Sequence, residues 1–170
     1  MTLNNLEQVR ERFISRWGML GQAWGISRTM AQIQGLLLIS DTPMNTDQIM
    51  EQLAISRGNA HNNLKELLTW KLARKVFIKG DRKEYYVCEK DPWSIFCTVA
   101  RERQRREIEP LLDTLQDIQE ELTHLPGQEA RTFQNQVASM SEFAELGNRI
   151  LDRVGRSEKS KLMKWLMTMA

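Results

Sequence analysis

The sequence has few of the residues from which disulfide-linked or metal-binding proteins are built. Its 170 residues include two cysteines, Cys88 and Cys97, and their spacing suits neither a disulfide framework nor a CxxC motif. The two histidines, His61 and His124, lie far apart, and no cluster of His, Cys and carboxylate residues has the spacing of metal ligands. We therefore expect neither a metal site nor a cofactor.

Long apolar runs are also missing. The longest, around residues 36–39, has roughly five residues, whereas a membrane-spanning helix needs about 20. The amino end lacks the basic and apolar segments of a secretory signal peptide. These features are typical of a cytoplasmic protein that does not bind a membrane.

Glycine and proline are too scarce for an all-β chain. There are nine Gly and four Pro, while the helix formers Leu, Met, Gln, Glu and Arg are abundant. The hydrophobic fraction of 41% and the charged fraction of 27% are those of a globular protein. The 24 Lys and Arg against 22 Asp and Glu leave a net charge of only +2, so only the distribution of charge can indicate a partner.

The first part of the chain predicts two helices. Through residues 3–24, apolar side chains recur three or four positions apart, as on one stripe of an amphipathic helix. These residues are Leu6, Val9, Phe13, Trp17, Leu20 and Trp24. Gly18, Gly21 and Gly25 should bend or end this helix. Ser27 is suited to cap a second, more buried helix that runs to residue 39.

The next part predicts a helix–turn–helix followed by a two-stranded ribbon. A helix capped by Asn45 or Thr46 runs to about residue 54, and a helix capped by Ser56 spans about residues 57–70, with Ile55 in the turn. β-branched and aromatic residues then predict two strands. The strands cover residues 74–78 and 84–88 and flank a hairpin turn at 79–82, in which Gly80 supplies an unusual backbone angle.

The carboxyl-terminal part predicts long helices. The first is capped by Ser94, with a kink or restart at Pro110. It carries a heptad seam, the pattern of a helix that pairs with another helix. The seam residues are Ile108, Leu111, Leu115, Ile118, Leu122 and Leu125. After a break at 125–127, apolar residues from Phe133 to Val154 predict another helix, and Leu162, Trp165, Leu166 and Met169 predict a last one.

Basic charge is concentrated in the segment that holds the second short helix and the ribbon. Residues 56–90 contain nine Lys and Arg against four Asp and Glu, a local excess of five in a chain whose net charge is +2. Lys79, Arg82 and Lys83 lie at the tip of the ribbon, where they suit a nucleic-acid backbone. A solvated basic face is an equally plausible interpretation of the charges alone.

The helix over residues 57–70 has an outer face of unusual composition. A helical wheel places Ala60, Leu64, Leu67 and Leu68 inward. The first two turns expose a polar set: Arg57, Gly58, Asn59, His61, Asn62 and Asn63. Within it Gly58, Asn59 and Asn62 point outward, whereas His61 and Asn63 lie on the flanks, as does Lys65. Asn and Gly are poor helix formers, whereas Asn can bind adenine through two hydrogen bonds. We therefore expect a DNA-reading helix, with a plain polar solvent face as the alternative, and we expect His61 to be a phosphate contact or a surface residue.

These residues resemble the winged helix–turn–helix of MarR-like regulators, and more narrowly the GbsR-type family. The resemblance covers about half of the chain. It is carried by Ser56-Arg57-Gly58-Asn59 at a helix start, by Lys79-Gly80-Asp81-Arg82-Lys83-Glu84-Tyr85-Tyr86 in the ribbon, and by Asp91-Pro92-Trp93 after it. One position departs: Lys71 stands where the family commonly has a Gly before the Leu that leads into the wing strand.

The resemblance implies a homodimeric transcriptional regulator, most simply a repressor, that binds a palindromic site on double-stranded DNA. It implies three regions: a dimerisation helix over 1–25, a winged helix–turn–helix domain over 26–93, and a helical dimerisation region over 94–170. The DNA contacts would come from the outer face of the second short helix and from the ribbon tip.

The resemblance also implies a small-molecule effector, which is choline for some members of the family. Quaternary ammonium cations bind aromatic cages, and Trp17, Trp24 and Trp93 are the candidates here. Their favoured interpretation is nevertheless that they anchor the core and interfaces. The alternative function is an architectural or protein-assembly module without an effector. We expect no catalytic residue and no enzyme activity, because no nucleophile elbow, phosphate loop or metal cluster is present.

Overall fold

The computed structural model describes residues 3–156, and these fall into two compact units. The first ends at Ile95 and the second begins at Phe96. The prediction of a mainly helical protein with a small β-ribbon is confirmed. Within residues 3–156, each helix is too short or too polar to cross a bilayer.

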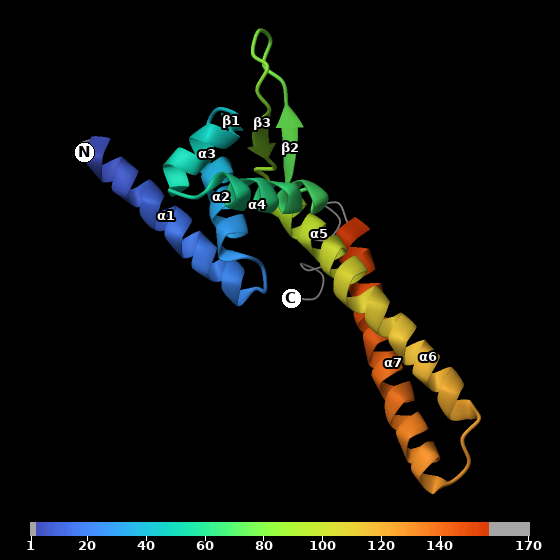
Figure 1. Cartoon of the computed structure of the whole chain (residues 1–170). Helices are drawn as coiled ribbons and strands as arrows, with labels where there is room; N and C mark the ends of the chain where they lie inside the picture. Colours follow the sequence, from blue (N-terminus) through green and yellow to red (C-terminus); the bar gives the residue numbers. More distant parts are fainter. Residues whose placement is uncertain (1–2, 157–170) are drawn as a thin grey trace, which may run out of the picture. The chain divides into compact units, whose positions relative to one another are not determined.

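The first unit contains the predicted winged helix–turn–helix (Figure 1). Its elements in chain order are α1 (Leu3–Ala23), α2 (Arg28–Ile39), β1 (Met44–Asn45), α3 (Thr46–Leu53), α4 (Arg57–Thr69), β2 (Ala73–Val76), β3 (Tyr85–Cys88) and the start of α5 (Pro92–Arg103). The core lies around α2, which contacts α1, α3, α4 and β3. Ile33, Ile49 and Leu67 are its largest fully buried side chains.

The sheet has one strand more than predicted. The three strands are antiparallel in the order β1-β3-β2, with Met44 opposite Tyr86 and Val76 opposite Tyr85. The two-residue strand β1 is too short to show any period in the sequence. β2 ends at Val76, two residues earlier than predicted, so residues 77–84 form a longer loop, here called the wing loop.

The helix caps follow the sequence closely in the first unit. Asn45 and Gln48 form a capping box at α3, Ser56 accepts from the Asn59 N–H at α4, and Ser27 accepts from the Met30 N–H at α2. Ile55 lies in the turn before α4 as predicted, and the preceding residue, Ala54, adopts the left-handed conformation, with φ of 50°. The cap predicted at Ser94 was wrong: the Asp91 carboxylate accepts from the Ser94 N–H, so α5 begins earlier, at Pro92.

Glycines in α1 serve a close helix crossing rather than a bend. α1 runs through Gly18 and Gly21 to Ala23 and ends before Gly25, where φ is +82°. A Cβ on Gly18 would lie 2.6 Å from Gln32 Cγ, and one on Gly35 of α2 would lie 2.9 Å from Trp17 Cδ1. The absence of side chains at these positions therefore lets α1 and α2 pack against each other.

Although Lys71 stands where the resemblance predicts a Gly, α4 ends in the cap that a glycine commonly forms. The Lys71 N–H donates to Leu68 O at 3.0 Å and the Leu72 N–H donates to Leu67 O at 2.9 Å, the two bonds of a Schellman cap. Lys71 adopts φ of 57° to make them. A side chain in this left-handed region costs about 1–2 kcal/mol, which glycine avoids.

We expect Lys71→Gly to raise the free energy of unfolding by about 0.5–1 kcal/mol, because the strain relieved exceeds the entropy that glycine adds to the unfolded chain. Urea unfolding would measure the change. Lys65→Gly, at an exposed position inside α4, is the matched control and should lower stability by about as much. Equal losses in both variants would contradict strain at Lys71.

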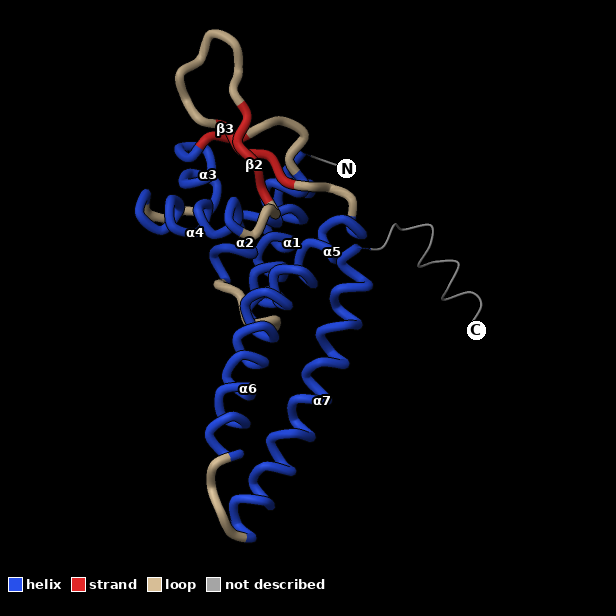
Figure 2. Tube along the Cα trace, turned by 90° about the vertical axis from the view of Figure 1, so that its right-hand side faces the viewer, coloured by secondary structure: helices blue, strands red, loops and turns tan. Residues whose placement is uncertain are grey.

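The second unit is built around an antiparallel helix pair (Figure 2). The end of α5 continues through a π-helical turn, Gln104–Ile108, into α6 (Glu109–Thr123), and α7 (Gln128–Arg156) returns beside it. The π-turn is the irregularity predicted at Pro110, because proline has no N–H for the ordinary helical bond. The last predicted helix, with Leu162, Trp165, Leu166 and Met169, lies outside the described residues.

The heptad seam of α6 finds its partner in the same chain. Leu115 and Leu122 are buried against Val137 and Ala144 of α7, with Leu112 and Ile118 packed at the edge. The ends of the seam, Leu111 and Leu125, are exposed. The middle of the seam is therefore packed against a helix of the same chain.

Candidate nucleic-acid interface

The α4 helix is held by its inner face and presents polar groups on its outer face. Ala60, Leu64 and Leu67 are buried in the core of the first unit. Most of the predicted outer residues are exposed: Arg57, Gly58, Asn59, His61, Asn62 and Lys65. No atom lies within 4 Å of the position that a Cβ on Gly58 would take, so the backbone there is open to a close approach.

Asn63 differs from its sequence-based placement. Its side chain is only 9% exposed, and its Nδ2 donates to the Asn59 carbonyl oxygen at 2.8 Å and to Asn59 Oδ1 at 2.7 Å. Asn63 therefore faces the helix and fixes the orientation of the Asn59 amide. The wheel placed Asn63 near the boundary between the faces, where small rotations decide burial.

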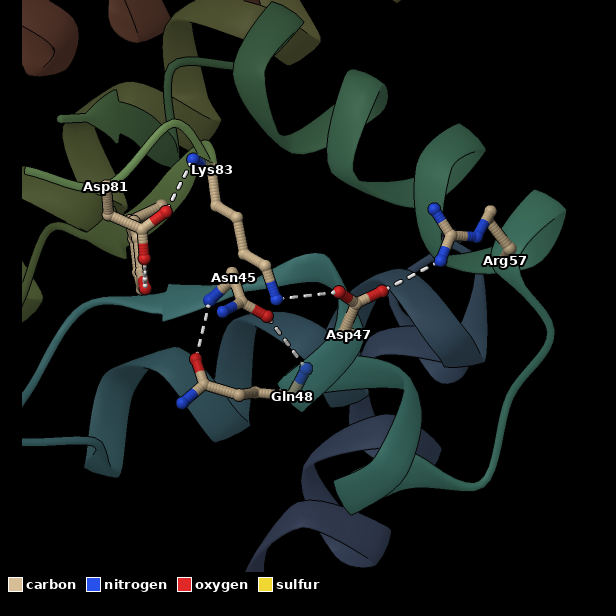
Figure 3. A network of polar contacts seen from close by, with 7 residues as sticks. Asn45, Asp47, Gln48, Arg57, Asp81 and Lys83 are labelled. Atoms are coloured by element: carbon tan, nitrogen blue, oxygen red, sulfur yellow. Dashed lines mark hydrogen bonds and ion pairs between the residues drawn. The ribbon is translucent and has the colours of Figure 1, made fainter. Parts of the chain in front are cut away.

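An acidic residue that the sequence analysis did not select links the predicted DNA-contacting elements. Asp47, in the first turn of α3, accepts from Arg57 Nη2 at 2.8 Å through Oδ1 and from Lys83 Nζ at 3.2 Å through Oδ2 (Figure 3). One carboxylate thus joins the start of α4 to the wing loop. Both ion pairs are exposed and so are individually weak.

The wing loop is shaped by a turn and by an aspartate that receives two hydrogen bonds. The Asp81 N–H donates to Ile78 O at 3.0 Å, and Gly80 within this turn has φ of +90°. The Asp81 carboxylate accepts from the Lys83 N–H at 2.9 Å and from the Tyr85 hydroxyl at 2.8 Å. The Lys83 bond, followed by the Tyr85 bond, lowers the pKa of Asp81. The loop therefore presents Lys79 and Arg82, both exposed, from a defined backbone.

A polar cluster lies at the base of the wing loop. Glu84 accepts from Lys75 Nζ at 2.7 Å and from the Tyr86 hydroxyl at 3.1 Å. The Lys75 bond is the main reason that the pKa of Glu84 is lowered, with a smaller contribution from nearby His61.

Known proteins that resemble the chain have regulatory roles. No protein-family model matches it. It is 30% identical over 97 residues to YvaV, a Bacillus subtilis protein classed with HTH-type transcriptional regulators; the match covers 57% of this chain and 55% of YvaV. It is 26% identical over 117 residues to the HTH-type transcriptional repressor GbsR of Bacillus subtilis, which covers 69% of this chain and 64% of GbsR. The homologues of the chain are thus HTH-type transcriptional regulators, GbsR among them.

The likeness in fold covers more of the chain than the sequence matches do. A solved transcriptional regulator matches with a TM-score of 0.69 and 21% identity, over 86% of this chain and 96% of that one. The sequence matches, by contrast, cover only 55% of the length of YvaV and 64% of the length of GbsR.

Two of the three candidate effector tryptophans lie together. Trp17 and Trp24 make an edge contact with ring centroids 6.2 Å apart, and Phe13 stacks on Trp17 at 5.6 Å. Trp17 Nε1 donates to Gln34 Oε1 at 3.3 Å, and Trp24 is 55% exposed. Trp93 lies half-buried in the first turn of α5.

Proposed function

We propose that the chain is a sequence-specific DNA-binding transcriptional regulator that acts as a homodimer on a palindromic operator. The observation that carries the proposal is the outer face of α4, where Asn59 and Asn62 are exposed next to an open glycine, Gly58. Asp47 links the start of this helix to the basic wing loop. Asparagine amides read base edges, while cations at the flanks bind phosphates. The names of the relatives GbsR and OpcR favour repression. Such a protein acts by binding, and burial raises the pKa of the Cys88 thiol to about 11, which disfavours a nucleophilic role there.

Exposed apolar surface supports the homodimer. On α1 the stripe predicted from the sequence remains largely exposed, since α1 packs on α2 through its glycine face. Its exposed members are Leu6, Val9, Leu20 and Trp24. On α7, Met140, Phe143 and Ile150 are exposed as well. A two-fold dimer would place two α4 helices about one DNA turn apart, roughly 34 Å.

We also propose a binding place for a cationic effector, at the ring pair Trp17 and Trp24. The exposed face of Trp24 beside Trp17 is suited to a quaternary ammonium group such as that of choline. Quenching of tryptophan fluorescence by choline, compared between the native chain and Trp24→Ala, would test it. Identical responses in both would remove this ring pair from the effector site.

The function is tested by sequencing the genomic DNA fragments that the purified protein retains. We expect inverted half-sites whose centres lie about 10 base pairs apart, or a multiple of this. Sedimentation should show the complex to contain two chains. Uniform, weak retention of all fragments would support an architectural module and contradict a regulator.

The cations of the wing loop should contribute affinity without selectivity. We expect Arg82→Ala/Lys83→Ala to weaken binding to operator and random DNA alike, and to lower the slope of log K against log salt by about 2, because each phosphate contact contributes about 0.9. Fluorescence anisotropy over a salt series would measure both. The control, Arg131→Ala/Arg149→Ala, removes the same charge from exposed positions of α7. An unchanged slope in the wing variant would mean that the loop does not contact phosphates.

Asp47 should limit the affinity for DNA, because it neutralises two cations that phosphates would otherwise contact. We expect Asp47→Asn to bind random DNA about threefold to tenfold more tightly and to steepen the salt slope by about 1. Glu51→Gln, an exposed acid on the same helix, controls for the general change of charge. Weaker binding by Asp47→Asn alone would instead show that the carboxylate acts mainly by positioning the wing loop.

A further inference from the structure

The wing loop begins with two apolar residues that face solvent. Phe77 is 78% exposed and Ile78 is 41% exposed. They are adjacent in the chain and directly follow β2, in the hairpin that extends beyond α3 and α4 (Figure 1). Single exposed apolar residues are common, but an aromatic and a β-branched residue together at the start of a basic loop are not explained by folding.

The sheet provides no place for these side chains. The ladder between β2 and β3 ends at the pair Val76 and Tyr85. The inward positions of the ribbon are Ala73, Tyr86 and Cys88, which are buried over the core. Phe77 follows the last paired residue, beyond the edge of that core, so its ring does not contribute to the packing of the first unit.

The surroundings of Phe77 favour a polyanion as the partner. Lys79 and Arg82 are exposed in the same loop, and Lys83 lies next to them. The hydrogen bonds that Asp81 accepts from Lys83 and Tyr85 fix the shape of the loop, so the Phe77 ring is presented from a defined backbone. An apolar ring among cations matches a nucleic acid, which combines phosphates with stacked aromatic bases.

The link between the wing loop and α4 indicates which groove of the DNA the loop would enter. Asp47 joins the start of α4 to the wing loop through Arg57 and Lys83. When α4 lies in the major groove, the loop beyond this link reaches the adjacent backbone and the minor groove next to it. Apolar side chains that enter a minor groove wedge between base pairs and kink the duplex.

We propose that Phe77 is such a wedge, entering the minor groove beside each α4 site, partly unstacking one base step and bending the operator. This inference rests on the proposed function. It also predicts a preference for a pyrimidine–purine step at the contacted place, because such steps unstack most easily.

The test uses the full chain and a retained genomic fragment, labelled at both ends for energy transfer and carrying 2-aminopurine at pyrimidine–purine steps that flank the half-sites. At saturating protein, the native chain should raise 2-aminopurine fluorescence and shorten the end-to-end distance. Phe77→Ala should lose both signals and bind about tenfold more weakly, since a straight duplex touches less of the protein surface than a bent one. Phe77→Leu should retain the bend, and Lys79→Ala should change the salt slope while retaining it.

The outcomes separate the inference from the function on which it depends. Full bending and base unstacking by Phe77→Ala would overturn the wedge while leaving DNA binding intact. A change in oligomeric size in Phe77→Ala, with an unchanged bend, would assign the ring to a protein interface and overturn it as well. If the native chain retains no fragment selectively, the proposed function itself fails.

Discussion

Replacing Leu122 with Asp is expected to unfold the helix pair of the second unit and to leave the winged helix–turn–helix folded. Leu122 is buried against α7 together with Leu115, so the substitution places a carboxylate in the small apolar seam. Loss of the packed side chain and burial of a charge together cost about 3–5 kcal/mol. The free energy of unfolding of a single helix pair is small, because a small core buries little apolar surface.

Hydrogen exchange resolved by segment measures this prediction. Protection should fall across α6 and α7 and persist in α2 and α4. Leu125→Asp is the matched control, because it alters the same heptad pattern at a position that is 57% exposed. Unchanged protection of α6 in Leu122→Asp would contradict a seam closed within the subunit, and equal losses in both variants would show that the acid acts without regard to burial.

The heptad pattern shows what sequence periodicity can and cannot establish. It correctly predicted that α6 pairs with a helix through Leu115 and Leu122. It could not say whether that helix belongs to the same chain, because an apolar stripe has the same spacing in either case. The exposed stripe of α1 shows the complementary limit: its apolar spacing is clear, but the sequence alone presents the glycines at 18 and 21 as a weakness of the helix. Only the position of α2 shows that they make a packing face.

The local signals of the winged helix were the most informative. Capping side chains act within one turn, so Asn45, Ser56 and Ser27 could be assigned from neighbouring residues. The strand β1 and the link through Asp47 could not, because both depend on contacts between distant segments. Lys83 lies 36 residues from Asp47, and nothing in the spacing relates them.

The asparagines of α4 should determine which DNA the protein selects. We expect Asn59→Ala/Asn62→Ala to lower affinity for a retained operator by about 100-fold, since each two-bond contact with adenine contributes about 1–3 kcal/mol. Affinity for random DNA of equal length should change little, because phosphate contacts remain. Anisotropy titrations at one salt concentration would give both values. Asn135→Ala, an exposed asparagine of α7, is the control. Equal losses on both kinds of DNA would show that these residues only place the helix.

The buried Asn63 gives a sharper form of the same prediction. Because its amide holds that of Asn59 at 2.7 Å, Asn63→Ala should reduce selectivity in the native background but hardly at all when Asn59 is already Ala. A plain loss of stability would lower affinity in both backgrounds and for both kinds of DNA. The selectivity ratio therefore separates a positioning role from a structural one. Additive losses of selectivity would mean that Asn63 acts independently of Asn59.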